Sequence, residues 1–257
     1  MRLMKRILSA AAVLALSASL LVGCSSTASS VPVSASSAAE STVSSVEETA
    51  SSAVDENEAA AAQLLNDLTG SYQELWPVIL ADEYKQTWLD DCTALVGEEN
   101  AEAAFEKLSS MVTSDVYGED AVEAYANGGG AYFCGFTNSL ATLTFDGETS
   151  TISGTDKDGN VLFSHAYHYI GMEPVRGLYE FESDDADSGE FTYFFLAPDT
   201  SVETYHIEFR YGSDAEALSQ YDAGEYAYWL ASGISTDCDQ TMIDNCIELF
   251  CTENLAG

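Results

Sequence analysis

In the second half of the chain, short apolar runs alternate with turn-forming residues, and this pattern constrains the fold more than any other feature. Asp146-Gly147, residues 157–160 and Pro198-Asp199 have the composition of tight turns. The runs between such turns predict strands over residues 131–137, 140–145, 149–153, 161–169, 175–182, 191–196 and 203–211. Short strands at nearly regular spacing predict an antiparallel meander, closed as a barrel or packed as a sandwich.

Helical patterns flank this run of strands. Residues 58–125 have apolar residues at helical spacing, and Ser71-Tyr72-Gln73-Glu74 fits a capping box at the start of a helix that Pro77 limits to short segments. Further helices are predicted over residues 82–94, from residue 100 onward, near Val122 and Tyr125, and over residues 214–223 and 239–252. Helices on both sides of a continuous antiparallel run predict an α+β fold.

The N-terminus has the features of a lipoprotein signal peptide. Basic residues at positions 2, 5 and 6 precede an apolar run over 7–20, which is too short for a comfortable membrane span. Leu21-Val22-Gly23-Cys24 then matches the lipobox of bacterial lipoproteins and predicts lipidation at Cys24; an ordinary secretory signal is the alternative. We therefore expect a protein anchored by lipid to the cell membrane on its extracytoplasmic face, at the cell surface or in the periplasm.

Composition divides the rest of the chain. Residues 24–56 are rich in Ser and Ala and contain no aromatic residue, so they predict a disordered stalk. After the signal peptide (1–23) and this stalk, we expect a helical lobe over 57–127. A β-barrel with closing helices follows over 128–257, and the two parts together form one domain.

The net charge of the chain argues against two classes of partner. The chain has 43 Asp and Glu but only 8 Lys and Arg, so nucleic acid and anionic lipid surfaces are poor partners. Cations are attracted, although diffuse attraction does not make a site.

Downstream of Cys24 the cysteines are Cys92, Cys134, Cys238, Cys246 and Cys251, and one local bridge among the last three is compatible with their spacing.

No catalytic signature is present in the sequence. It has no G-x-S-x-G motif, no Walker motif and no dinucleotide fingerprint, and Gly128–Gly130 precedes a strand instead of opening a helix. These absences favour a binding protein over an enzyme.

A series of short motifs in the same order resembles the ZinT family of zinc-binding, calycin-like bacterial proteins. The family pattern is an aromatic helix after a short L-x-x-x-G, a Y-x-Y-x-G strand, a V-R-x-L-x-E strand, an A-P turn, an H-x-H-I strand and a closing amphipathic helix. The matching residues are Leu68-Thr69-Gly70, Trp76-Pro77, Tyr167-His168-Tyr169-Ile170-Gly171, Val175-Arg176-Gly177-Leu178, Ala197-Pro198 and Tyr205-His206-Ile207.

The resemblance implies a lipocalin-like barrel with a helical lobe, and a role in extracytoplasmic zinc binding or delivery. His206 matches the second His of H-x-H, whereas Thr204 and Phe194 occupy the positions of two other family histidines. The implied partners are a divalent metal and a component of a zinc-uptake transporter.

The strand that carries His206 can also be read from its own alternation. Thr204, His206, Glu208 and Arg210 share one face, and the residues between them form an apolar face. His206 and Glu208 could supply two zinc ligands, with His168 or His165 as a third; these two histidines are three residues apart and point to opposite faces. Alternatively, His206 is structural, bonded to Glu208 or to a Tyr inside the barrel mouth.

Three hypotheses therefore remain open from the sequence, of which the third is an enzyme, such as a hydrolase, whose site no motif reveals. In the first, the domain binds zinc or another divalent cation and delivers it to an uptake system, with His206, Glu208 and His168 as the named metal ligands. In the second, a calycin module that has lost the metal site binds another ligand or a protein. The aromatic residues of the strands either line a ligand cavity or fill the barrel.

Overall fold

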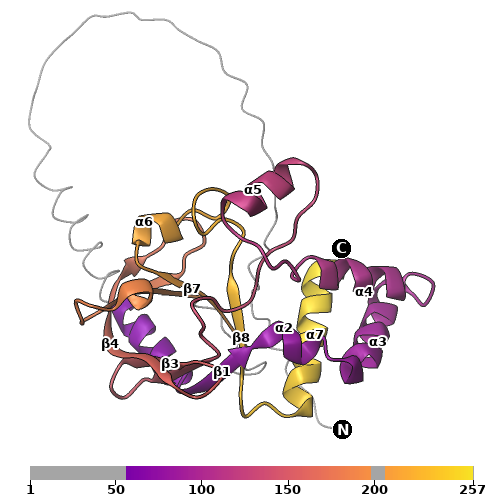
Figure 1. The fold of residues 1–257 in the computed structure, drawn as a ribbon. Coiled ribbons are helices and arrows are strands. Elements are labelled where there is room, and N and C mark those ends of the chain that lie inside the picture. The colour runs from indigo at the N-terminus through magenta and orange to yellow at the C-terminus, as the bar shows by residue number, and fades with distance from the viewer. Residues whose placement is uncertain (1–55, 198–205, 257) are drawn as a thin grey trace, which may run out of the picture. The chain divides into compact units, whose positions relative to one another are not determined.

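Eight antiparallel strands close into a barrel, in which each strand pairs with the next in sequence and the last pairs with the first (Figure 1). The structure, a computed structural model, describes residues 56–197 and 206–256, all within one folded unit. The strands are β1 (Gly70–Glu74), β2 (Thr142–Asp146), β3 (Thr151–Thr155), β4 (Val161–Met172), β5 (Tyr179–Ser183), β6 (Tyr193–Leu196), β7 (His206–Gly212) and β8 (Ala231–Ser235). The predicted meander barrel and the α+β class are confirmed.

Most helices gather on one side of the barrel as a helical lobe (Figure 1). The lobe consists of α2 (Leu75–Ile79), η1 (Asp82–Tyr84), α3 (Lys85–Val96), α4 (Ala101–Ser110) and the C-terminal α7 (Gln240–Leu255). A helix over residues 56–67 precedes β1, and α5 (Glu119–Ala126), η2 (Gly189–Phe191) and α6 (Ala215–Leu218) lie between strands. Among the described residues, no helix has both the length and the apolar character needed to cross a membrane.

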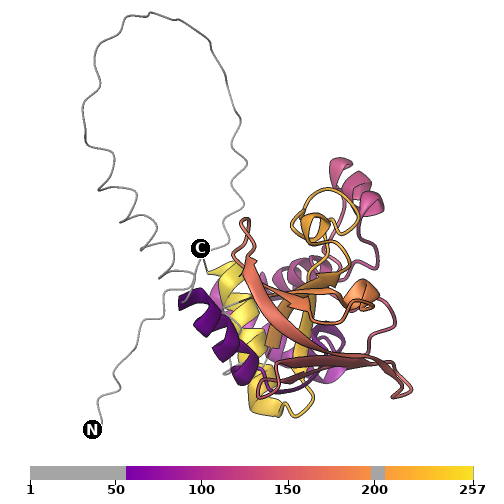
Figure 2. The ribbon, with the colours of Figure 1, turned by 90° about the vertical axis from the view of Figure 1, so that its left-hand side faces the viewer.

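The element α5 stands out from the barrel beside the loop that follows α6, in both views (Figures 1 and 2). Tyr125 of α5 stacks on Tyr228 of that loop, with ring centroids 3.7 Å apart. The amide of Gly118 also donates to the carbonyl of Ala227 at 2.8 Å. These contacts join α5 to the loop.

The capping box predicted at Ser71 is wrong, because these residues form strand β1. The Ser71 hydroxyl bonds to the Thr144 hydroxyl of β2 at 2.8 Å, and Tyr72 pairs with both Leu143 and Ser235. Residues 70–74, inside the predicted helical lobe of 57–127, are therefore part of the barrel wall. The helix predicted from Ser71 onward is reduced to α2, which follows β1 directly. It is five residues long with Pro77 inside it, and Pro77 was expected to limit the helix to a short segment.

The strand predicted over residues 131–137 is also wrong. In this segment Phe133 forms isolated bridges to Thr113 and Trp229, and no ladder develops. The strand that completes the barrel is instead β8, which the sequence analysis did not identify. Its sequence is Ala231-Ser232-Gly233-Ile234-Ser235, in which Ile234 is the one large apolar residue, so it lacks a clear strand signature.

Aromatic side chains fill the barrel. The rings of Phe194 and Tyr211 lie 5.4 Å apart, and Tyr167 meets Phe194 edge to face at the same distance. The buried residues that share this core are Phe145, Phe163, Tyr167, Phe181, Phe194, Phe209, Tyr211 and Trp229. Of the two alternatives for the aromatic residues, the structure supports interior filling.

A second core lies between the lobe and the outer wall of the barrel. Trp88, fully buried in α3, donates its indole N–H to the carbonyl of Ile79 at 2.7 Å. Ile247 of α7 is also fully buried in this core. Asp239 caps α7 by accepting from the amide of Met242, so this helix begins where the sequence predicted. The second core holds α7 against the barrel wall.

Candidate functional site

His206 and Glu208 lie on the outer wall of the barrel. Along β7, Ile207 and Phe209 point into the barrel core, while His206 and Glu208 are half-buried on the opposite face. The alternation predicted for this strand is confirmed for its described residues. The alternative position for His206, inside the barrel mouth, is wrong, because the interior face of β7 belongs to the apolar residues.

Helix α7 brings two more side chains of metal-binding type to the same place. His206 and Glu208 line one pocket together with Cys246 and Glu253 of α7. Residues seven apart in a helix are separated by about two turns, so Cys246 and Glu253 share a face. The rest of the pocket is apolar and comes from Leu75, Trp76, Ile79, Leu249 and Phe250. This pocket, lined by an imidazole, two carboxylates and a thiol, is the candidate site.

The Cys246 thiol is protonated at neutral pH. Burial raises its pKa to about 12, and the neighbouring Glu208 carboxylate adds to the rise. Because a thiol must lose its proton to bind a metal, zinc would have to displace that proton. His206, Glu208 and Glu253 carry no thiol, so they can bind a metal without this step.

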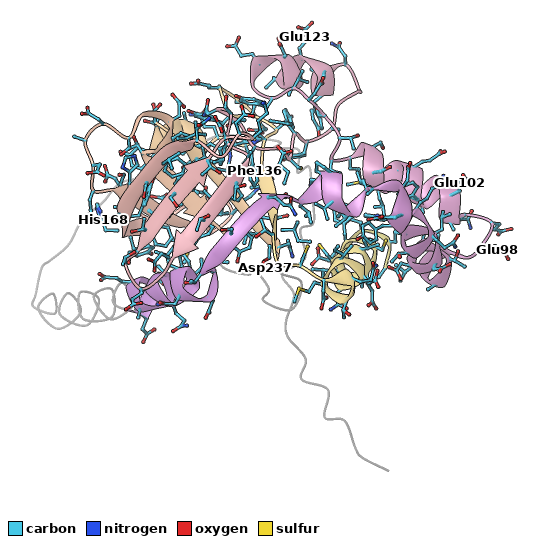
Figure 3. The ribbon with its side chains drawn as sticks, turned by 60° about the horizontal axis from the view of Figure 1, so that its bottom comes forward. Glu98, Glu102, Glu123, Phe136, His168 and Asp237 are labelled. Carbon is cyan, nitrogen blue, oxygen red and sulfur yellow. The ribbon has the colours of Figure 1, made fainter. Side chains whose placement is uncertain are left out.

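The other two histidines lie on β4, away from this pocket. His168 is on the exposed outer face, where its Nδ1 lies 2.7 Å from Oδ1 of Asp184. His165 is on the opposite face, where its Nδ1 lies 2.7 Å from Oδ2 of Asp185 and its ring stacks on Phe163. Figure 3 shows His168 on the part of the barrel remote from α7. The structure therefore does not bring His168 to the pocket of His206.

The donors of the candidate site line one pocket but do not converge on a single point. Within residues 56–197 and 206–256, no three His, Cys, Asp or Glu side chains form a group that could hold a metal ion. Phe194, at the position of one family histidine, is fully buried in the barrel core. Thr204 and the predicted lipidation site Cys24 lie outside the described residues.

A buried cluster around Arg210 was not predicted from the sequence. Arg210 is fully buried and donates to the backbone carbonyls of Leu218, Gln220 and Tyr226. Its guanidinium carbon lies 4.4 Å from the centre of the Tyr221 ring. Burial lowers its pKa to about 10. The Arg210 side chain thus holds the loop after α6 against β7.

The same Tyr221 ring has a second guanidinium beside it. The guanidinium carbon of Arg176 lies 4.3 Å from the ring centre, and the Tyr221 hydroxyl donates to Oε2 of the fully buried Glu173 at 3.3 Å. Glu173 also accepts from the amides of Val175 and Arg176. The Val175-Arg176 motif of the sequence therefore has a structural role here. The presence of Arg176 and Arg210 in apolar runs was the only sequence signal for this cluster.

A second pocket, of about 330 Å³, lies outside the barrel against α2. Glu74 supplies its carboxylate, whose Oε1 accepts from the amide of Phe136 at 2.6 Å. Most other lining residues are apolar or weakly polar: Trp76, Pro77, Leu80, Val112, Thr113, Ser114, Phe133, Cys134 and Gly135. Its volume lies within the range of small-molecule pockets, roughly 300–1,000 Å³.

Comparison with known proteins gives matches among solved structures. No protein-family profile and no curated protein matches the chain. The Zn(II)-bound ZinT-like domain of Streptococcus pneumoniae AdcA aligns with 72% of this chain and 89% of its own, at 15% identity and a TM-score of 0.45. Zn(II)-bound AdcA from the same organism aligns with 72% of this chain and 35% of its own, at 14% identity and a TM-score of 0.43.

Proposed function

We propose that this chain is a lipid-anchored extracytoplasmic protein that binds a divalent cation, zinc first, and passes it to an uptake system. The observation that carries the proposal is the shared pocket of His206, Glu208, Cys246 and Glu253. Zinc is bound in proteins by this set of donors, usually three or four of them at about 2 Å. The strongly acidic composition of the chain favours a cationic cargo.

Binding at this pocket requires side-chain movement. Glu253 is exposed on the last turns of α7, so its carboxylate can change rotamer without disturbing a core. His206 and Glu208 are two residues apart on one face of a strand and stay side by side. We expect Glu253 to close on the metal held by these two residues. A site completed by movement suits reversible loading and release of a cargo.

Zinc binding is tested by calorimetric titration of the metal-free full chain at neutral pH. We expect one stoichiometric site of sub-micromolar affinity that His206→Ala weakens at least about tenfold, because that change removes a ligand. Glu253→Gln should weaken it as well. His168→Ala is the matched control, since His168 is exposed and lies on another strand. It should leave the affinity unchanged.

Weak binding to many sites, equal in the His206→Ala and wild-type chains, would disprove the metal role. Loss of binding in His168→Ala alone would place the site on β4 and contradict the pocket assigned here. Retention of a tight site in both variants would exclude His206 and His168 as ligands.

The second pocket supports a different candidate function, the binding of a small organic ligand. A molecule with an apolar ring and an amino group fits its apolar walls and the Glu74 carboxylate. The probe 1-aminoanthracene should show saturable fluorescence enhancement with the full chain. Val112→Trp fills the pocket and should abolish the signal, whereas Val175→Trp, at an exposed position, should preserve it. Equal probe binding by all three proteins would reject this pocket.

A further inference from the structure

Two buried cysteines far apart in the sequence meet between α3 and α7. Cys92 of α3 and Cys251 of α7 are both fully buried, and their Sγ atoms lie 3.9 Å apart. The two residues are separated by 159 positions in the chain. A disulfide bond is about 2.05 Å long, so the two sulfur atoms must move closer together to form one.

The other cysteines have different surroundings. Cys246 and Cys251 are five residues apart on α7, which places them roughly 140° apart around the helix axis, so they point to different sides. Cys246 lies in the candidate pocket on the side of β7. The spacing of the last three cysteines is compatible with a local bridge, but the direction of Cys251 on α7 does not favour its bonding to Cys246. The sulfur neighbour of Cys251 is Cys92.

We propose that Cys92 and Cys251 form a disulfide that links α3 to α7 when the chain folds in an oxidising compartment. The oxidant is a small-molecule or protein disulfide. One cysteine thiolate attacks a sulfur of that disulfide and releases one of its halves as a thiol. The second cysteine then attacks the mixed disulfide and releases the other half. The oxidant gains two electrons and is reduced to two thiols. These two thiols carry the protons that the two cysteines have lost.

The position of the bridge gives it a large effect. It joins the first long helix of the lobe to the last helix of the chain, so it closes a loop that contains β2 to β8. A cross-link over so long a loop strongly restricts the unfolded chain. It also fixes α7, the helix that provides one wall of the candidate pocket. The disulfide is independent of whether that pocket binds zinc.

The test is peptide mapping of the full chain refolded with oxidised glutathione, digested without reduction. We expect a peptide pair linked through Cys92 and Cys251. Thermal unfolding should show a midpoint about 10 °C higher for the oxidised than for the reduced protein. Cys92→Ala and Cys251→Ala should each abolish this difference. Cys246→Ala, which removes another buried thiol of α7, should retain it.

Quantitative alkylation of both thiols after oxidation and denaturation would overturn the proposal, as would a map in which Cys251 is linked to Cys238 or Cys246. The map of the wild-type chain is decisive even if a cysteine variant fails to fold, because it requires no substitution.

Discussion

Raising the pH should unfold this domain cooperatively near pH 11. Burial raises the pKa of Cys134 and Cys246 from 9.0 to about 12. Burial likewise raises the pKa of the Tyr167, Tyr211 and Tyr221 phenols well above 10.0. Above pH 9–10 the unfolded chain loses these protons while the folded chain retains them. The free energy of unfolding therefore falls as the pH rises.

The size of this effect is comparable to the whole stability of a domain. At pH 11 the five groups together lower the free energy of unfolding by about 10 kcal/mol, against a typical total of about 5–15 kcal/mol. The lowered pKa of Arg210 acts in the opposite direction and offsets about 1 kcal/mol of this loss. Tyrosinate absorbance at 295 nm and far-UV circular dichroism, recorded in reductant, should change together. In Tyr221→Phe, which keeps the ring beside both guanidiniums, the dependence on pH should be shallower. Retention of full ellipticity at pH 12 would contradict the prediction.

Removing the Arg210 side-chain donors should be the most damaging single substitution on the outer wall of the barrel. Arg210→Met keeps the length of the side chain but leaves the carbonyls of Leu218, Gln220 and Tyr226 without these donors. It also removes the guanidinium above Tyr221. We expect a loss of about 3–5 kcal/mol in the free energy of unfolding, measured by urea denaturation.

The control for this prediction is Lys85→Met. Lys85 is 4.0 Å from Glu102, and both side chains are more than half exposed, so this ion pair should contribute little. The loss should stay within about 0.5 kcal/mol. If Arg210→Met cost no more than Lys85→Met, the loop after α6 would not depend on Arg210.

Acidic side chains are spread over the surface of the domain. Figure 3 shows Glu98, in the turn between α3 and α4, Glu102 of α4 and Glu123 of α5 pointing outward. Exposed carboxylates that lie far apart are screened from one another by salt. They contribute to the general attraction of cations, and this is why the zinc experiment depends on stoichiometry and on a matched histidine control.

Much of the barrel could be predicted from local patterns. Six predicted strands, which correspond to β2 through β7, have alternating or apolar runs bounded by turn residues such as Asp146-Gly147. The helices α3, α4, α5 and α7 follow helical apolar spacing, and Asp239 supplied a cap for the last of them. These features depend on residues close together in the chain, and such interactions are visible in a sequence.

The two strands that close the barrel could not be predicted in this way. β1 and β8 are five residues each and lack a run of β-branched residues, and β1 even imitates a capping box. They are strands because Tyr72 lies between Leu143 and Ser235, two partners far away in the sequence. Backbone hydrogen bonds to distant partners determine these segments, and local propensity does not.

The sequence by itself determined that His206 and Glu208 share one face and that apolar residues occupy the other, because side chains alternate along a strand. Only the tertiary structure decided that this face is the outer wall of the barrel, opposite Cys246 and Glu253 of α7. The same holds for Cys92 and Cys251, whose sulfur atoms meet because two helices pack together. Alternation along a strand can be recognised in the sequence alone. Contacts between distant segments form only when the barrel closes and the helices pack against it around a buried core.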